Sequence, residues 1–277
     1  MATAGEVLRH YHEATKHSLA SVSGSTHRMD WYNKPLPFKI YSTLAKIDPP
    51  EDLARLCLYT NGILRWSRDA AGEVYGFRAA PCTGALYHIE LYLAVAARPD
   101  LPAGLYHYSA HDYGLRRLRD ADVRGLLYEA SGRFPPVGTA PLVLVLTSTF
   151  WRNSWKYQAR AYRHSYWDSG VIIANLLELT AADGTSASVV MGFADDAVNH
   201  LLGIDGEHEA AVALVAIGEA SAVPSGRGDL PEIDYPTAPL SRRQVEYPAI
   251  VEAHRASSLR SAEAVQAWRE LAGGQTA

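Results

Sequence analysis

The chain has 277 residues, of which 48% are hydrophobic and 20% charged, values typical of a soluble globular protein. This length allows one large domain or two small ones. The formal charge of −4 predicts no nucleic-acid partner. No apolar run approaches the roughly 20 residues that a membrane span needs, and the N-terminal residues lack the apolar core of a signal peptide. The two cysteines, Cys57 and Cys82, form no Cys-x-x-Cys pair, so we expect a cytoplasmic protein with neither a disulfide scaffold nor a zinc site.

The first quarter of the chain contains two predicted helices. We expect one helix over residues 6–20, ending near His17, and an irregular segment over 21–50 that prolines interrupt. Apolar residues at helical spacing, with acidic residues at the start, predict a second helix over 51–65. Residues 66–77 are expected to form a polar loop.

The middle of the chain is predicted to supply most of a sheet. We expect a buried strand over 89–96 and a hairpin made from 104–109 and 115–119. A short helix is predicted over 122–131. The apolar run at 141–148 is typical of a central strand that is covered on both faces.

The second half mixes helices and strands without strict alternation, which favours an α+β sheet over a doubly wound parallel one. The predicted elements are a helix over 157–182, a strand over 187–191, a helix over 197–202 opened by two aspartates, a strand over 210–217, an extended arm over 219–248, and one or two helices over 249–272.

A small-residue loop directly before the strand at 89–96 is the first candidate site. It reads Pro81-Cys82-Thr83-Gly84, and backbone amides beside such small side chains can approach a flat or anionic ligand closely. The alternative is a tight turn before a core strand.

The run from Lys156 to Arg163 is the second candidate, because it brings two phenols and three cations together. Lys156 and Tyr157 could hold a developing anion or move a proton. The alternative is a solvated helix N-terminus, although cations there oppose the helix dipole and so need another partner.

The third candidate is Gly192-Phe193, where a strand is predicted to end just before a helix N-terminus that offers free amides to an anion. The alternative is an ordinary strand–helix turn.

The sequence contains no Walker loop, His-Glu-x-x-His, Gly-x-Ser-x-Gly or Gly-x-Gly-x-x-Gly motif. The histidines are not spaced like a metal set, and we expect surface or supporting roles for His88, His107, His111, His164, His200 and His208.

Four segments, in this order, resemble the nitroreductase superfamily. More narrowly, they resemble its SagB-type dehydrogenase branch, the azoline oxidases of thiazole/oxazole-modified peptide pathways. The resemblance runs from about residue 53 to 218, and its segments are RAAPCTGALYHIELYLAV at 78–95, LPAGLYHY at 101–108, KYQARAYRHSYWDSGVIIANLL at 156–177 and GFADDAVNHLLGIDGEHE at 192–209.

The resemblance implies an α+β fold with a mixed, mainly antiparallel sheet flanked by helices. It also implies bound FMN and a dimer whose flavin sites lie at the subunit interface. Lys156 and Tyr157 match a lysine–tyrosine pair assigned to proton handling, and the chemistry implied is hydride transfer from an azoline ring to the flavin. The cofactor-binding residues implied are Arg78, Pro81, Cys82, Thr83, Gly84, Gly192 and Phe193.

The sequence also departs from the family pattern. The arginine run that clamps the FMN phosphate should lie before residue 51, where FKIYSTLAKIDPP stands instead. The loop serine is Cys82 here, the proline after the tyrosine is His88, and Met191 replaces the first glycine of a pair. Two glycines and a glutamate are missing from the KYGERGYR pattern.

A second resemblance accounts for these departures. Segments 11–17, 31–39 and 236–250 resemble the N-terminal half of SagB-like proteins that contain two nitroreductase-like halves. The chain therefore looks like such an N-terminal half alone, and its counterpart with the arginine clamp would be a separate polypeptide.

Two functions follow as alternatives. The first is an FMN-dependent oxidoreductase that dehydrogenates an azoline or other peptide substrate, as a homodimer or a heterodimer. The second is a non-catalytic subunit that supports a flavin-bearing partner. In both, we expect an N-terminal segment over 1–50 packed on the core, an FMN domain over 51–218, and an arm with helices over 219–277 that contacts the other subunit.

Overall fold

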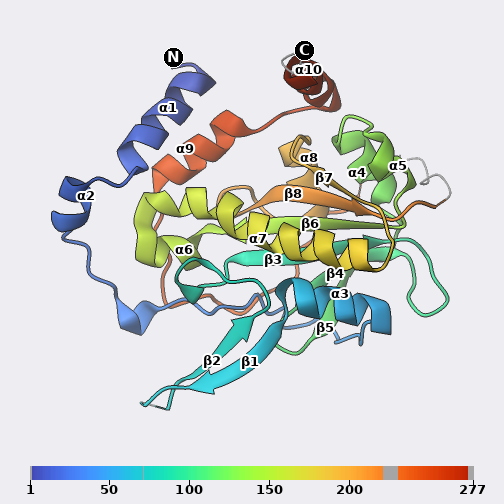
Figure 1. The fold of residues 1–277 in the computed structure, drawn as a ribbon, viewed down its shortest axis with the longest axis horizontal. Helices are drawn as coiled ribbons and strands as arrows, with labels where there is room; N and C mark the ends of the chain where they lie inside the picture. The colour runs from blue at the N-terminus through green and yellow to red at the C-terminus, as the bar shows by residue number, and fades with distance from the viewer. Residues whose placement is uncertain (1, 71, 221–229, 274–277) are drawn as a thin grey trace.

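The centre of the molecule is a six-stranded antiparallel sheet, seen in a computed structural model that describes residues 2–70, 72–220 and 230–273 (Figure 1). The strands lie in the order β5-β4-β3-β6-β8-β7, and every neighbouring pair is antiparallel. Their bounds are β3 (Ile89–Val95), β4 (Gly104–Ser109), β5 (Gly114–Arg119), β6 (Leu142–Thr149), β7 (Ala187–Val190) and β8 (Glu209–Ile217).

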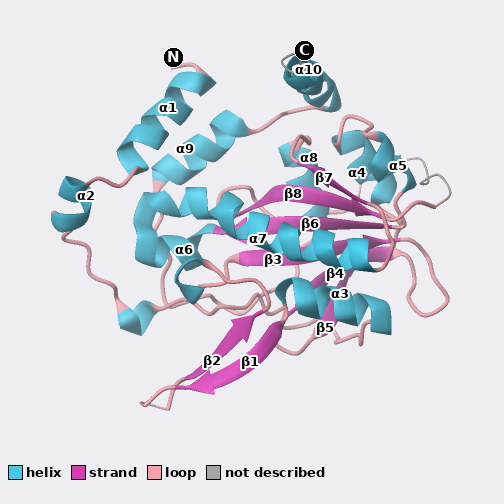
Figure 2. Ribbon diagram, viewed as in Figure 1, coloured by secondary structure: helices cyan, strands magenta, loops and turns pink. Residues whose placement is uncertain are grey.

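Helices cover both faces of this sheet (Figure 2). One face packs against α3 (Glu51–Asn61) and α7 (Ala161–Ala182), and the other against α4 (Arg124–Ala130), α5 (Pro135–Thr139) and α8 (Asp195–Leu202). Strands β3 and β6 are buried along their whole length, and alternate side chains enter the two cores. The predicted α+β fold with an antiparallel, helix-flanked sheet is confirmed. Among the described residues, no helix is both long and apolar enough to cross a membrane.

The two ends of the chain run side by side over one edge of the core. Leu36 donates its backbone N–H to Leu240 O at 2.7 Å, and Ala238 donates to Ile40 O at 2.8 Å. Further helical segments are α1 (Ala4–Thr15), α2 (Leu19–Ser23), η1 (Trp31–Asn33), η2 (Thr83–Ala85), α9 (Pro248–Ser257) and α10 (Ala262–Gly273). Part of the predicted arm, residues 221–229, lies outside the described residues.

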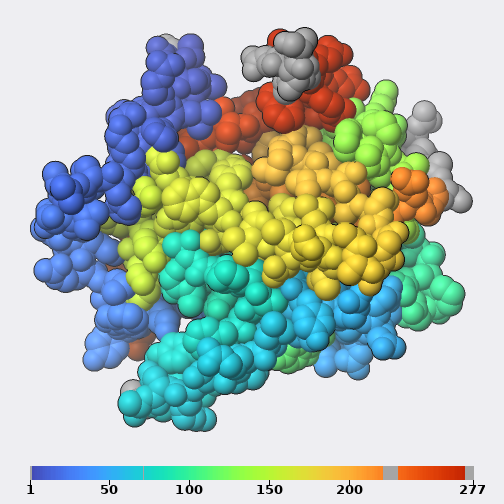
Figure 3. All heavy atoms as spheres, viewed as in Figure 1, coloured from blue at the N-terminus to red at the C-terminus, as the bar shows by residue number. Residues whose placement is uncertain are grey.

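A two-stranded hairpin replaces the polar loop predicted over 66–77. Strands β1 (Ile63–Arg68) and β2 (Val74–Arg78) pair with each other and project from the body of the molecule (Figure 3). Trp66 and Phe77 remain substantially exposed on this hairpin. The prediction was wrong because the strands face solvent and carry charged residues among their aromatic ones, so no apolar run marks them.

The long helix predicted over 157–182 is interrupted. Helix α6 (Phe150–Tyr157) is capped by Gln158, whose φ is +51°, and the short turn η3 (Gln158–Arg160) leads into α7. Lys156 therefore lies in the last turn of α6, where a cation interacts favourably with the helix dipole. It does not begin the long helix, and the unfavourable interaction expected there does not arise.

Candidate functional site

The loop between β2 and β3 contains a concentration of strained backbone. Gly84, Ala85 and Tyr87 have φ values of 70°, 54° and 48°, and only the first is a glycine. Residues without a glycine's freedom adopt this region at an energetic cost, which the surrounding structure must offset. The loop tip at Gly84 and Ala85 is exposed, so the strain is placed where a ligand can reach it. Such strain is common at binding sites and supports a functional role for the loop.

The carboxylate of Asp168, on α7, anchors this loop. It accepts hydrogen bonds from Thr83 N at 2.9 Å, Thr83 Oγ1 at 2.7 Å and Cys82 Sγ at 3.1 Å, and it lies 2.9 Å from His88 Nε2. Burial alone would raise the pKa of Asp168, but the hydrogen bonds from His88, Cys82 and Thr83 outweigh it and lower the pKa to about 2. Asp168 therefore carries its charge throughout the physiological range.

Two of the groups around Asp168 are held in their neutral forms. Burial raises the pKa of the Cys82 thiol to about 12, and the nearby Asp168 charge acts in the same direction. A thiol in this state is a poor nucleophile at neutral pH. Burial also lowers the pKa of His88, whose Nδ1 lies 2.9 Å from Ser148 Oγ. Ser148 in turn bonds to Ser165 on α7, which extends the polar chain into the core.

Tyr157 lies directly against the loop. A Cβ added at Gly84 would stand 2.8 Å from the Tyr157 hydroxyl, so only glycine fits at this point. The Tyr157 ring packs edge-on against His164 at 4.8 Å between ring centres. His164 Nδ1 lies 2.6 Å from Asn153 Oδ1, and Asn153 Nδ2 donates to Thr83 O at 3.2 Å. The phenol and the loop backbone are thus parts of one connected arrangement.

The two basic residues predicted for the site have different environments. Lys156 is half-buried, and its Nζ lies 5.4 Å from the centre of the Tyr157 ring. Arg78 is only 6% exposed, donates through Nη2 to Pro37 O at 2.6 Å, and lies 5.1 Å from the Tyr87 ring centre. Arg78 is therefore engaged by its own chain.

Gly192 and Phe193 lie in a different part of the molecule, in the turn between β7 and α8. Phe193 packs in the core on the opposite side of the sheet from α7, and Figure 1 shows α8 and α7 apart. Phe193 is 3% exposed and belongs to the core that α8 covers. Gly192 is buried beneath Trp268 of α10, and a Cβ at Gly192 would collide with that ring. The structure thus brings the loop, Lys156 and Tyr157 together, but within one chain it does not bring Gly192 and Phe193 to them.

Sequence reasoning missed Asp168, Asn153 and the buried position of His88. One signal was present, since Cys82 and His88 are both departures from the family pattern and both contact Asp168. Asp168 is also an acidic residue within a helix whose following turns are largely apolar.

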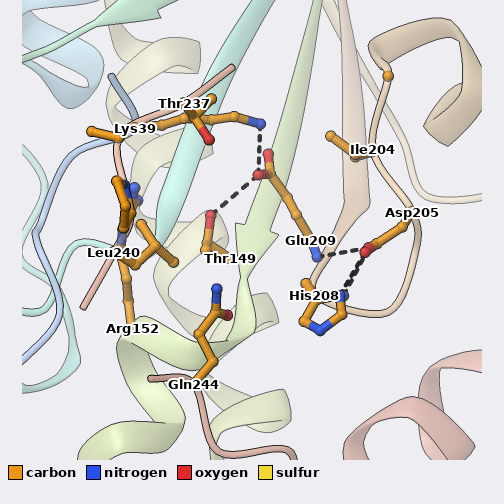
Figure 4. A pocket seen from close by; sticks show the side chains of 13 residues that line it. Lys39, Thr149, Arg152, Ile204, Asp205, His208, Glu209, Thr237, Leu240 and Gln244 are labelled. Carbon is orange, nitrogen blue, oxygen red and sulfur yellow. Dashed lines mark hydrogen bonds and ion pairs between the residues drawn. The ribbon is translucent and has the colours of Figure 1, made fainter. Parts of the chain in front are cut away.

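A pocket of about 280 Å³ lies where β6 ends and β8 begins, and the arm from Thr237 to Leu240 forms one wall (Figure 4). Its polar floor is a buried ion pair in which Lys39 Nζ donates to Glu209 Oε2 at 2.8 Å. Tyr92 and Thr147 also donate to this carboxylate, at 2.9 and 2.6 Å. The charges here are paired, so we assign this network to holding the segment around Lys39 on the core.

Several solved structures share this fold. A candidate nitroreductase of Anabaena variabilis aligns with a TM-score of 0.75 at 28% identity, covering 91% of this chain and 54% of its own. A chain of the E. coli microcin synthetase McbBCD complex, solved with truncated pro-MccB17 bound, aligns with a TM-score of 0.51 at 21% identity, covering 77% of this chain and 82% of that one.

The family assignment rests on a match to a family profile. The nitroreductase family profile matches residues 62–219, more than half of the 277 residues, and this chain therefore belongs to the nitroreductase family. A candidate nitroreductase of Methanocaldococcus jannaschii is 26% identical over 129 residues, which are 47% of this chain and 65% of that protein. The chain thus spans just over half of the Anabaena chain and just under two thirds of the archaeal protein.

Proposed function

We propose that this chain forms one half of an FMN site in an oxidoreductase, and that a second nitroreductase-like chain supplies the other half. The observation that carries the proposal is the contrast between two glycines. Gly84 lies at an exposed, strained loop tip, whereas Gly192 is buried under this chain's own Trp268 on the other side of the sheet. A ligand that is contacted by both a Gly84-type loop and a Gly192-type turn therefore has to lie between two chains.

The fit of FMN to the residues of one chain is partial. Gly84 and Ala85 leave backbone open to a planar ring, and the Tyr157 hydroxyl lies close enough to exchange a proton with a group bound there. Arg78 and Phe193 are engaged within the chain, and the sequence before residue 51 lacks the arginine run that would clamp a phosphate. FMN, when bound, accepts a hydride and so supplies two-electron chemistry.

The lengths of the related proteins favour a heterodimer over a homodimer in this proposal. The Anabaena chain is nearly twice the length that this chain covers, and three segments of this sequence resemble the N-terminal half of two-half proteins. A separate chain with the arginine run would complete the phosphate site.

The substrate class that we propose is an azoline ring within a peptide. The resemblance to the SagB-type branch supports this choice. Oxidation would remove one hydride and one proton from the ring, with Lys156 and Tyr157 as the candidate groups for the proton. Mass spectrometry of a thiazoline-containing peptide incubated with the paired chains tests the choice. Loss of two hydrogens supports it, whereas an unchanged mass with reduction of a quinone or nitroaromatic compound would point to another substrate.

The role of the loop is tested separately, by adding a side chain to it in the paired complex. Gly84→Val places a branched side chain on the Tyr157 hydroxyl, and Ala85→Glu changes the exposed tip without touching that contact. We expect each change to weaken FMN binding by at least about tenfold, roughly 1.4 kcal/mol, without altering assembly of the pair. Gly5→Ala, at a site with no atom within 4 Å of the added Cβ, is the matched control. Unchanged FMN affinity in both loop variants would remove the loop from the flavin site.

A further inference from the structure

Three metal-ligating side chains converge beneath the strained loop. The Sγ of Cys82, Nε2 of His88 and a carboxylate oxygen of Asp168 all lie within 4.8 Å of one another, and this is the one such group that the described residues contain. The Sγ and Nε2 atoms lie 3.1 and 2.9 Å from the same oxygen, Asp168 Oδ2. Cys82 and His88 lie in the loop before β3 and Asp168 lies in α7, so the three meet only in the folded chain, with Asp168 more than 79 residues from either partner.

We propose that Cys82, His88 and Asp168 bind a zinc ion. Thiolate sulfur, imidazole nitrogen and carboxylate oxygen are the three donors that Zn²⁺ takes in proteins, and three protein ligands leave a fourth position for water. With metal–ligand bonds of about 2.0–2.3 Å, tetrahedral donors lie about 3.3–3.6 Å apart. The two measured separations are shorter by roughly half an ångström, because hydrogen bonds now join these atoms. A small outward shift of Cys82 and His88 therefore makes room for the ion.

The surroundings orient each ligand, as is general in zinc sites. His88 Nδ1 lies 2.9 Å from Ser148 Oγ, which fixes the ring so that Nε2 points to the centre of the group. The backbone N–H of Tyr87 donates to Cys82 Sγ at 3.1 Å, an interaction that stabilises a thiolate. Thr83 Oγ1 donates to the other carboxylate oxygen, Asp168 Oδ1, at 2.7 Å, so Oδ2 is left to the metal and the loop amide.

Binding can be written with every proton accounted for. The S–H bond of Cys82 is replaced by an S–Zn bond, and the thiol proton passes to solvent. His88 now donates its single ring proton from Nε2 to Asp168. On metal binding this proton is exchanged through solvent to Nδ1, so that Nε2 gives its lone pair to the metal and Nδ1–H donates to Ser148 Oγ. Asp168 is already ionised and changes no proton. Water molecules leave the hydrated ion in exchange, and no oxidant or reductant is needed.

A zinc ion here would join the loop to α7 more firmly than the present hydrogen bonds. Cys82 is partly exposed and the loop tip beyond it is open, so solvent can reach the group from this side. The inference is independent of the flavin proposal, because it concerns side chains below the loop within one chain. The two departures from the family pattern, Cys82 and His88, gain a common role.

The test uses the full chain and two metals. Protein expressed with added ZnSO₄ and freed of loose metal by gel filtration is assayed for zinc by mass spectrometry, and we expect about one ion per chain. Replacing zinc with Co²⁺ should give the intense near-ultraviolet charge-transfer band of a cobalt–thiolate bond, which needs no variant. A folded wild-type chain with no retained zinc and no such band would overturn the proposal.

Variants then assign the ligands. Cys82→Ser and His88→Gln should each weaken zinc affinity by at least about tenfold in competition with a chromogenic chelator. Cys57→Ala is the matched control, because Cys57 is a buried cysteine in α3 and not a member of the group. If the control loses zinc and Cys82→Ser retains it, the metal lies elsewhere and the assignment is wrong. Circular dichroism establishes that each variant is folded before it is scored.

Discussion

Two glycine-containing segments of this chain belong to the same family pattern but are held in opposite ways. The loop at Gly84 is exposed, strained and anchored by polar groups around the Asp168 carboxylate. The turn at Gly192 is buried and covered by the Trp268 ring. The Gly84 segment is open to a ligand, whereas the Gly192 segment is covered by a side chain of the same chain. Two segments of one family pattern therefore need not both face a ligand within one chain.

The largest expected effect is on the polar anchor of the loop. Asp168→Asn removes the charge that Thr83, Cys82 and His88 share, and hydrogen bonds to charged groups contribute about 1.5–3 kcal/mol each. Because the amide keeps part of these contacts, we expect a loss of about 3 kcal/mol in the free energy of unfolding, measured in urea. Asp183→Asn, at a half-exposed site that caps the C-terminal end of the same helix, is the control. A loss below about 1 kcal/mol would contradict the anchoring role.

Next in size is Gly84→Ala, which combines two costs. The left-handed φ of 70° costs a residue with a Cβ about 1–2 kcal/mol, and the contact with the Tyr157 hydroxyl adds to this. We expect Gly84→Ala to lower the free energy of unfolding by about 2–3 kcal/mol in total. Adding Tyr157→Phe to the same chain should recover only the part that comes from the contact with the hydroxyl. Complete rescue by Tyr157→Phe would show that backbone strain at the loop is absent.

The corresponding change in the other segment should behave differently. Gly192 has no left-handed φ, so the cost of Gly192→Ala comes from the Trp268 ring alone, at about 1–3 kcal/mol. We therefore expect Trp268→Ala to remove nearly all of this cost in a double-mutant cycle. Additive effects of the two substitutions would mean that Trp268 does not cover Gly192.

The smallest expected effect concerns pH. Burial lowers the pKa of His164, which is 2% exposed, to about 4 from an ordinary value near 6.5. Because the folded state resists protonation, the stability is complete above pH 6.5 and falls as the pH drops toward 4. We expect His164→Gln to reduce the loss of unfolding free energy between pH 7 and pH 5 by about 1–2 kcal/mol. His200→Gln, at an exposed site, is the control. If both variants lose the same unfolding free energy between pH 7 and pH 5, His164 is not the source of the pH dependence.

Much of the fold could be predicted because its signals are local. The apolar run at 141–148 predicted the central strand β6, and the turn between 109 and 115 predicted the β4–β5 hairpin. The exposed β1–β2 hairpin escaped prediction because no core selects its residues. The break between α6 and α7 at Gln158 was not predicted, because glutamine is not a residue type that favours a positive φ.

The candidate site was predictable only where the chain is contiguous. Residues 81–84 were visible as a small-residue loop before a strand, and Lys156 and Tyr157 as a phenol–cation pair. The Asp168 anchor joins residues some 80 positions apart, and its partners are set by how α7 crosses β3. The covering of Gly192 likewise depends on where α10 packs. Such contacts follow from tertiary packing, which residue spacing does not encode.

The most direct measurement of the central claim is the flavin content of the purified protein. The chain should be produced alone and together with a nitroreductase-like chain that carries the arginine run, with FMN added to both. The shared-site account predicts that the chain alone stays colourless, and that the pair is yellow with FMN bound at the interface. Full FMN occupancy in the chain purified alone, with no second polypeptide present, would contradict it.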